Sequence, residues 1–342
     1  MDQKRKILAY LSRRDAAAGG ALRAHLGLSR QALSVHIRRL VEAGKVVRSG
    51  TTRGARYTLA SRAPAPAVVS RPLLTRGLDE GRVWDDLAAR LNLRRVLRPN
   101  VEAIVRYAFT EMLNNAIEHA ESDRCAIRFS LGAGAVSFQV HDPGIGAFHS
   151  IASKLHLPDE ETALVELLKG RTTTMREAHT GEGLFFTSKV ADRFVLRSHR
   201  IQVEWNRARD DVFVSKPRFL GGTDVRFAIQ RSTRRRLEEV FGEFAPTEYD
   251  FQFQKTKVLV KLLQRDYVSR SEARRLLANL EKFSEIVLDF RDVKSMGQGF
   301  ADEVFRVFAS RNPAIVISTE NTNPVLDAMI RHVRSGPLRS PE

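Results

Sequence analysis

Residues Phe109–Ala120 read FTEMLNNAIEHA, and their spacing predicts a helix. Apolar side chains from Ile104 onwards recur at every fourth position, which places them on one face of a helix with 3.6 residues per turn. Glu111, Asn115 and His119 recur at the same interval and share a second face. One helix is therefore expected to bury an apolar stripe while it aligns a carboxylate, a carboxamide and an imidazole.

This polar face has the chemistry to serve a hydrated Mg²⁺. A hard cation keeps several of its waters and accepts one or two protein oxygens beside substrate phosphates. Among the three side chains, Asn115 is the residue that we expect to bind the metal.

Two glycine motifs follow along the chain. The first, VHDPGIG at Val140–Gly146, comes after a predicted strand and sets the carboxylate of Asp142 beside a backbone that can approach a planar ring closely. The second, HTGEGLFF at His179–Phe186, opens a predicted helix, where free amides and the helix dipole favour phosphate. Each motif alone has a plainer explanation, since the first is also a common turn and the second a common helix start.

In this order and spacing, the helix and the two glycine motifs resemble the N, G1 and G2 boxes of the GHKL ATPase superfamily. The pair Gly222-Thr223, which leads into a strand, looks like the fourth element of that family. The resemblance covers about residues 82 to 230. It implies an α/β sandwich, a mixed sheet backed by helices, that binds ATP with Mg²⁺.

The resemblance also assigns roles to single residues. Asp142 is expected to accept the adenine amine, Asn115 to bind Mg²⁺, and Glu111 to act as a general base on water or a protein hydroxyl. The amides of the second glycine motif are expected to hold the phosphates. The full set of expected nucleotide contacts is Asn115, Asp142, Gly144, Gly146, Thr180, Gly181, Gly183, Leu184 and Thr223.

Length, charge and cysteine content set the outer limits. The 342 residues suffice for two or three domains. Residues 1–62 carry 14 Lys or Arg against three acids, which is +11 of the chain's net +16 and indicates a module that meets polyanions. Cys125 is the single cysteine, so no intrachain disulfide can form. Because no apolar run approaches 18 residues, we expect a cytoplasmic protein without a membrane partner.

The basic segment predicts three helices followed by a hairpin. The expected elements are helices at 4–12 and 21–26, a third helix capped by Ser29, and strands at 45–49 and 55–59. Their order resembles winged helix-turn-helix domains and implies double-stranded DNA as the partner, with the third helix in the major groove. The alternatives are a small domain with a solvated basic face and a winged helix that binds protein.

The expected DNA contacts divide between the third helix and the wing. They are Arg30, Gln31, Ser34, Arg38, Arg48, Arg53 and Arg56. Arg30, Gln31 and Ser34 are expected nearest to base edges, whereas the arginines of the hairpin are expected to neutralise phosphates.

The remaining chain divides into three further segments. Residues 63–81 are rich in proline and alanine and are expected to form an extended linker between the winged helix at 1–62 and an ATP-binding domain at 82–245. Within the latter, the 34 residues between Gly146 and Gly181 are expected to contain one helix at 158–169 and to act as a lid. Near its end, Ser232 is expected to cap a helix at 233–244 whose Arg234–Arg236 cluster is solvated. Strands alternate with helices over 246–336, among them a helix at 270–283 capped by Ser269, and predict a small α/β sheet.

The last segment carries its own resemblance. Its sequence from Ile286 to Phe300 resembles STAS-like domains of the DUF4325 type, which are related to anti-sigma-factor antagonists. Those antagonists often present a phosphorylatable serine at the place that Gly297–Gly299 occupies here. Ser295 lies out of register, which puts phosphorylation of this domain in doubt.

Three functions fit these observations. The first is an ATP-gated DNA-binding regulator, with a regulatory protein as a further partner. The second is a serine protein kinase like the anti-sigma-factor kinases, acting on a STAS-type partner. The third is a non-hydrolysing scaffold, against which the presence of Glu111 counts. A histidine autokinase is disfavoured because none of the nine histidines precedes the site in a helix beside an acid. The sequence says nothing of the oligomeric state.

Overall fold

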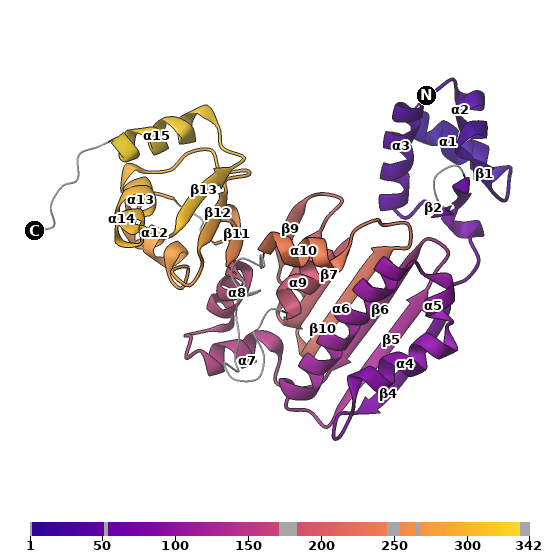
Figure 1. Cartoon of the computed structure of the whole chain (residues 1–342), viewed down its shortest axis with the longest axis horizontal. Helices are drawn as coiled ribbons and strands as arrows, with labels where there is room; N and C mark the ends of the chain where they lie inside the picture. Colours follow the sequence, from indigo (N-terminus) through magenta and orange to yellow (C-terminus); the bar gives the residue numbers. More distant parts are fainter. Residues whose placement is uncertain (1, 51–53, 171–182, 245–253, 264–266, 336–342) are drawn as a thin grey trace, which may run out of the picture. The chain divides into compact units, whose positions relative to one another are not determined.

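Three helices and a hairpin form the N-terminal domain of the computed structural model, which describes residues 2–50, 54–170, 183–244, 254–263 and 267–335 (Figure 1). The elements of this domain are α1 (Gln3–Ser12), β1 (Ala17–Ala18), α2 (Gly19–Leu26), α3 (Arg30–Glu42), β2 (Val46–Ser49) and β3 (Arg56–Leu59). Apolar residues of all three helices share one core with Val46 of the hairpin. The winged-helix prediction is confirmed, apart from β1, which forms because its backbone pairs with β3.

A seven-stranded sheet follows, with the strand order β4-β5-β6-β10-β7-β8-β9. Its strands are β4 (Ala67–Leu74), β5 (Arg124–Leu131), β6 (Ala135–Asp142), β7 (Arg193–His199), β8 (Ile201–Asn206), β9 (Asp211–Ser215) and β10 (Leu220–Gln230). Each described pairing is antiparallel, so the sheet is antiparallel where a mixed sheet was expected.

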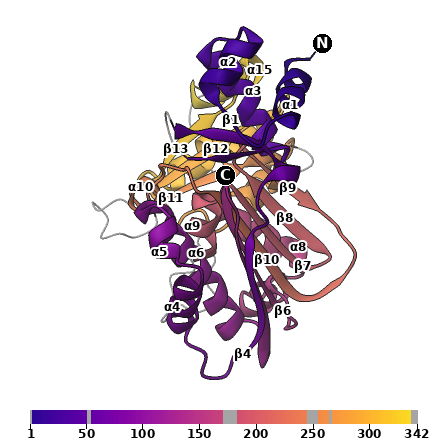
Figure 2. The ribbon, with the colours of Figure 1, turned by 90° about the vertical axis from the view of Figure 1, so that its right-hand side faces the viewer.

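Helices cover one face of this sheet. They include α4 (Glu80–Arg90), α5 (Leu93–Val96) and α6 (Pro99–Glu118), and Figures 1 and 2 show α4 and α6 lying along the strands. Aromatic rings fill the layer between them: Phe109 of α6 meets Phe138 of β6 edge to face at 5.4 Å, and Phe138 stacks on Phe227 of β10 at 4.9 Å. Such pairs add to the burial of apolar area. The predicted sandwich of sheet and helices is confirmed.

The expected linker at 63–81 needs a correction. Residues Ala67–Leu74 form β4, the edge strand that pairs with β5 along its whole length. Proline has no N–H to donate, but an edge strand tolerates it because one side of its backbone has no partner strand. Pro72 therefore did not exclude a strand at this position.

The helix expected from Ser232 also begins later, as α10 (Leu237–Phe244). The preceding backbone is bound to α6 instead, because Asn100 Nδ2 donates to the carbonyls of Thr233 (3.2 Å) and Arg235 (2.7 Å). Arg235 was expected in solvent, yet its side chain is 13% exposed and pairs with Asp192 at 2.6 Å. Tertiary contacts thus override the local helix signal here.

The chain divides into two compact units, and each is described by itself. The first comprises residues 1–146 and 187–237, and the second comprises 147–186 and 238–342. The second unit contains α7 (Ala147–Lys154), α8 (Glu160–Lys169) and the first half of α9 (Gly183–Val190). The sequence predicted α8 but not α7.

The second unit also holds a three-stranded parallel sheet of order β11-β12-β13. Its elements are β11 (Lys255–Leu259), α11 (Val260–Leu263), α12 (Arg270–Leu277), β12 (Glu285–Asp289), α13 (Gln298–Asp302), a π-helical segment (Glu303–Phe308), α14 (Ala309–Arg311), β13 (Val316–Glu320) and α15 (Pro324–Ser335). Ser269 caps α12 as predicted, in a capping box with Glu272.

The helix α12 ends earlier than the sequence indicated, which was Phe283. Ala278 leaves the helical conformation, and Asn279 follows with a positive φ of 63°. Asparagine is one of the few residues that adopt this left-handed conformation readily. Among the described helices of the whole chain, none is both long and apolar enough to cross a lipid bilayer.

Candidate functional site

The helix α6 presents the polar line that its spacing predicted. Its apolar stripe is buried at all five positions, namely Ile104, Ala108, Met112, Ala116 and Ala120. Glu111, Asn115 and His119 are each partly buried along the other face. The helix ends at Glu118, and the amide of the cap residue His119 donates to the carbonyl of Asn115 at 3.0 Å.

The first glycine motif lies directly against the end of α6. The amide of Ile145 donates to the carbonyl of Ala120 at 2.9 Å. A Cβ atom on Gly144 would stand 1.9 Å from that same carbonyl oxygen. Only glycine, which has no Cβ atom, permits this close approach. The loop can therefore pack against the end of α6 only with glycine at position 144.

Asp142 is the last residue of β6 and faces into this junction. It lies opposite Thr223 on β10, is 5% exposed, and accepts a hydrogen bond from the amide of Gly144 at 3.0 Å through Oδ1. Burial raises the pKa of its carboxyl group, and the hydrogen bond from Gly144 offsets only part of that effect. A carboxylate is thereby fixed in a shielded place where it can accept from an amine.

Gly222 and Gly146 each bring the backbone close to a neighbouring strand at the loop that follows Asp142. Gly222 has a φ of +77°, and a Cβ there would lie 2.0 Å from the carbonyl oxygen of Asp142. Gly146 has a φ of +87°, and a Cβ there would lie 2.7 Å from Ser198 Oγ and 2.8 Å from His199 Nε2. Both positions combine a left-handed backbone with a close neighbour, so both need glycine.

Ser198 and His199, at the end of β7, were not predicted as site residues. Ser198 is fully buried, and its Oγ finds no hydrogen-bond partner among the residues that the structure describes. His199 has a positive φ of 50° and stacks on Phe219 at 5.1 Å. No sequence pattern marked either residue, because their place beside Gly146 results from the strand order.

The second glycine motif is described only in part. Thr180 and Gly181 lie outside the described residues. Gly183 and Leu184 begin α9 within the second compact unit. The residues that the structure brings together are those of α6, β6 and β10 with the loop from Asp142 to Gly146.

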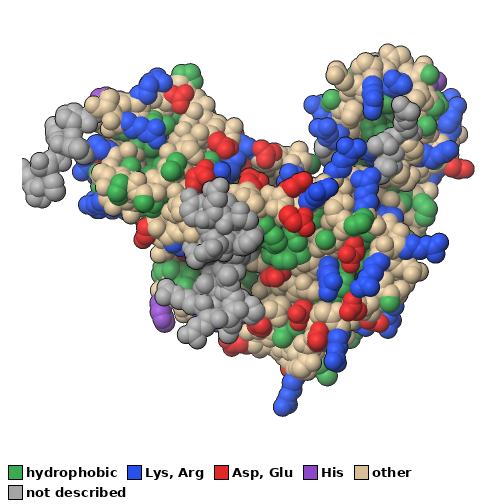
Figure 3. All heavy atoms as spheres, in the orientation of Figure 1, with side chains coloured by type: hydrophobic (Ala, Val, Ile, Leu, Met, Phe, Trp, Pro, Cys, Tyr) green, Lys and Arg blue, Asp and Glu red, His purple; other side chains and the backbone are tan. Residues whose placement is uncertain are grey.

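The exposed face of α3 carries the predicted DNA contacts. Arg30, Gln31, Ser34 and Arg38 are all exposed, and the buried side of the helix faces the domain core. Ser29 caps the helix through its Oγ, which accepts from the amide of Ala32 at 3.1 Å. Lys and Arg side chains are frequent on the visible surface of this domain, at the upper right of Figure 3.

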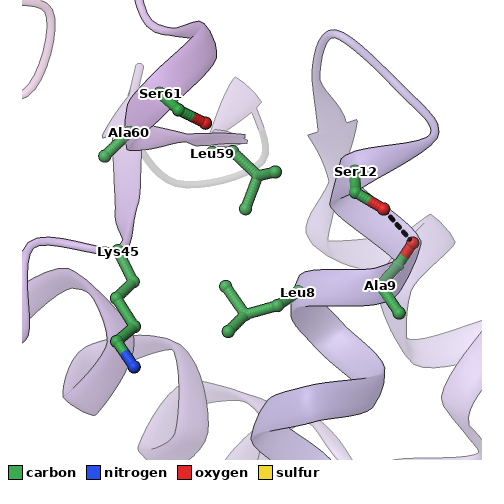
Figure 4. Close-up of a pocket in the computed structure, with 7 residues that line it drawn as sticks. All are labelled: Leu8, Ala9, Ser12, Lys45, Leu59, Ala60 and Ser61. Atoms are coloured by element: carbon green, nitrogen blue, oxygen red, sulfur yellow. Dashed lines mark hydrogen bonds between the residues drawn. The ribbon is translucent and has the colours of Figure 1, made fainter.

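The hairpin shows a less uniform picture. Arg56 is exposed, Arg48 is partly buried, and Arg53 lies outside the described residues. The same domain has an open hollow of about 500 Å³ that is lined by Leu8, Ala9, Ser12, Lys45, Leu59, Ala60 and Ser61 (Figure 4). None of the predicted nucleotide or DNA contacts lines that hollow.

Comparisons with known families agree with these three regions. Residues 2–47 match the family model for winged helix-turn-helix DNA-binding domains, residues 78–204 match that for histidine kinase-like ATPase domains, and residues 272–327 match that for a STAS-like domain of unknown function (DUF4325). No curated protein matches the chain. The chain therefore joins a winged helix-turn-helix DNA-binding domain, a histidine kinase-like ATPase domain and a STAS-like domain, in the order that its motifs predicted.

Proposed function

We propose that this chain is an ATP-binding regulator in which occupancy of the nucleotide site controls the binding of DNA or of a protein partner. The observation that carries the proposal is the buried carboxylate of Asp142, which accepts a hydrogen bond from the amide of Gly144 at the loop where β6, β10 and the end of α6 meet. Charged groups are costly to bury, so a carboxylate that is kept at this loop favours a ligand from which it accepts a hydrogen bond.

The site residues fit a nucleotide with Mg²⁺. Asp142 would accept a hydrogen bond from the exocyclic amine of adenine, and Asn115 would offer one oxygen to the metal. The hydroxyl of Ser198, which has no hydrogen-bond partner within the described part of the chain, lies beside the same loop. Glu111 lies one helical turn before Asn115 and would orient a nucleophile as general base. The bound metal would supply charge neutralisation at the phosphates.

A serine kinase remains the second candidate, and the STAS-like domain bears on its acceptor. A Cβ at Gly297 would stand 2.6 Å from the carbonyl oxygen of Val268, so the backbone there has no room for serine. The chain's own domain is thus a poor acceptor at this place. If the chain is a serine kinase, its substrate must be a separate STAS-type protein.

Calorimetry with Mg-ATP and with a non-hydrolysable analogue tests the proposal. Binding is expected in the wild type and is expected to weaken greatly in Asp142→Asn and Asn115→Ala. Asp224→Asn is the matched control, because Asp224 is an equally buried carboxylate of β10 that pairs with Arg226. Unchanged affinity in both folded site variants would refute the nucleotide site.

Incubation with ATP labelled at the γ-phosphate distinguishes the remaining functions. Label on protein indicates a kinase, free labelled phosphate indicates an ATPase, and bound but intact ATP indicates a switch that works through occupancy alone. Glu111→Gln should abolish the first two outcomes while leaving nucleotide binding in place.

A further inference from the structure

A buried lysine ends the helix α8. Lys169 is 1% exposed, although lysine is almost never fully buried unless it is paired. Its ammonium group donates to Glu166 Oε1 at 2.8 Å and to the carbonyl oxygens of Arg275 (3.0 Å) and Ala278 (2.9 Å). All three of its protons are thereby used.

The two carbonyls belong to the end of α12 in the STAS-like domain. The last carbonyls of a helix have no partner within the helix and carry its partial negative charge. The turn at Asn279 ends α12 at this place and leaves Arg275 and Ala278 available. Lys169 thus supplies, from a separate helix, the cation that this helix end favours.

Further hydrogen bonds join α8 to the same domain. Asn279 Nδ2 donates to Glu166 Oε2 at 2.9 Å, and Thr256 Oγ1 of β11 donates to the carbonyl of Lys169 at 2.6 Å. We call Lys169, Glu166, Asn279 and Thr256 the Lys169 cluster. Glu166, Lys169 and Thr256 are buried, so their mutual bonds act in a medium of low polarity.

A second contact lies in the first half of α9, at the end of the second glycine motif. The ring of Phe186 meets Phe241 of α10 at 4.5 Å, and that of Phe185 meets Phe244 at 5.1 Å, both edge to face. The carbonyl of Phe244 in turn accepts from the amide of Gln254, which precedes β11. The chain on either side of residues 171–182 is thus bound to elements that lead into the STAS-like domain.

We propose that the STAS-like domain, through the Lys169 cluster, holds helix α8 and so sets the affinity of the nucleotide site. The proposal rests on the function proposed above and names the route of its regulation. Helix α8 follows the first glycine motif in the chain and α9 begins at the second, so a nucleotide that engages both motifs constrains α8 and the start of α9. Any change in how the STAS-like domain holds α8 then changes the free energy of nucleotide binding, and the reverse holds equally.

The test compares nucleotide affinity in variants of the full chain. Lys169→Met keeps the length of the side chain but removes the ammonium that donates to the buried carboxylate of Glu166, which breaks the cluster. We expect the Kd for Mg-ATP to change by about 5- to 150-fold, the usual range of coupling between sites. Glu303→Gln is the matched control, because Glu303 is a buried carboxylate of the same domain that pairs with Arg274. Its Kd should stay within about twofold of the wild type.

Two milder variants cover the case in which Lys169→Met does not fold. The double change Lys169→Met with Glu166→Met removes both charges together, and Thr256→Val removes one hydrogen bond at nearly constant volume. A shifted Kd in either folded variant supports the proposal.

Hydrogen exchange supplies a readout that a purely structural role would not move. In the wild type a saturating ATP analogue should slow the amide exchange of residues 270–279, and this effect should vanish in Lys169→Met. Equal Kd values in wild type and in the folded variants, with exchange at 270–279 indifferent to nucleotide, would overturn the proposal. If the wild type binds no nucleotide, the proposed function itself fails and this inference falls with it.

Discussion

The residues of the candidate site differ in how far their sequence context specified them. Asp142 was identified because its glycine motif, in order and spacing with the two other motifs, resembles the GHKL pattern. The pattern could not show that burial raises the pKa of this carboxyl, since burial depends on β10 and on the end of α6. Ser198 and His199 were missed for the same reason.

The raised pKa of Asp142 predicts a stability that depends on pH. The folded protein binds the Asp142 proton more tightly than the unfolded chain does, so this carboxyl favours the folded state in acid and opposes it as pH rises through the folded pKa. Asp142→Asn removes the charge and should therefore stabilise the ATPase domain more at pH 7 than at pH 4. The expected difference is about 1.4 kcal/mol for each unit by which the pKa is raised.

Urea unfolding followed by tryptophan fluorescence measures this effect, because Trp84 and Trp205, the two tryptophans of the chain, belong to α4 and β8 of this domain. Asp142→Asn should also lose nucleotide binding. A variant that is more stable but does not bind nucleotide would show that Asp142 serves binding and lowers stability. An equal gain in the free energy of unfolding at both pH values would contradict the raised pKa of the Asp142 carboxyl.

Gly144 gives a second prediction at this scale. Gly144→Ala would force a methyl group to 1.9 Å from the carbonyl oxygen of Ala120, so the loop or the helix end must move. We expect the free energy of unfolding to fall by about 1–3 kcal/mol, as for other overpacked sites. Gly221→Ala is the control, since a Cβ there meets nothing within 4 Å and should cost less than about 0.5 kcal/mol. Similar losses in both variants would show that the close contact is unimportant.

At the scale of elements, the sequence predicted best where periodicity and burial agree. In the helices α3 and α6, apolar residues recur at the helical period. In the hairpin β5–β6, buried and more exposed residues alternate, as one buried face requires. The strand β4 was taken for a linker because alanine and proline are poor local strand signals. It becomes a strand only because the edge of β5 offers it hydrogen bonds.

The opposite error occurred where the local sequence favoured a helix but a tertiary contact held the backbone in another conformation. A helix was expected from Ser232, but the salt bridge between Arg235 and Asp192 and the bonds from Asn100 hold residues 233–235 in another conformation. The helix α12 was likewise expected to run past Ala278, where Lys169 now occupies the free carbonyls. Both contacts join residues far apart in the sequence, which a local pattern cannot register.

The exposed face of α3 makes a prediction about DNA. Arg38→Ala should lower the slope of log K against log salt by about one unit if this arginine contacts one phosphate of duplex DNA. Arg14→Ala is the control. This change removes the same charge from the same domain, but the side chain of Arg14 stacks on Tyr10 of α1 and does not belong to the exposed face of α3. Filter binding or fluorescence anisotropy over a salt series measures both slopes. Binding that does not depend on salt would instead indicate a winged helix that binds protein.

At the scale of the whole molecule, the compact units do not follow the order of the domains in the sequence. The segment from Ala147 to Phe186, which lies between the two glycine motifs, belongs to the same unit as the STAS-like domain. The boundary expected near residue 246 therefore does not isolate an independent module. A chain that ends there would leave Lys169 without Thr256 and the end of α12, and would leave Glu166 without the hydrogen bond from Asn279.

This organisation predicts the behaviour of such a truncated chain. Without residues 246–342 the ammonium of Lys169 loses two of its three acceptors, and α8 loses its packing against β11. We expect faster amide exchange throughout α8 and a changed affinity for Mg-ATP. Exchange and affinity equal to those of the full chain would show that α8 needs no partner.

In the proposed regulator, nucleotide occupancy controls the binding of DNA or of a protein partner, and the affinity of the full chain for duplex DNA tests the DNA branch of this proposal most directly. We would measure this affinity at one low salt concentration without nucleotide, with ADP and with a non-hydrolysable ATP analogue. A coupling of 1–3 kcal/mol, typical of allosteric proteins, predicts about a 5- to 150-fold difference between at least two of these states. Asp142→Asn should remove that difference without removing DNA binding. Equal affinities in all three states, in a protein that demonstrably binds ATP, would contradict the account.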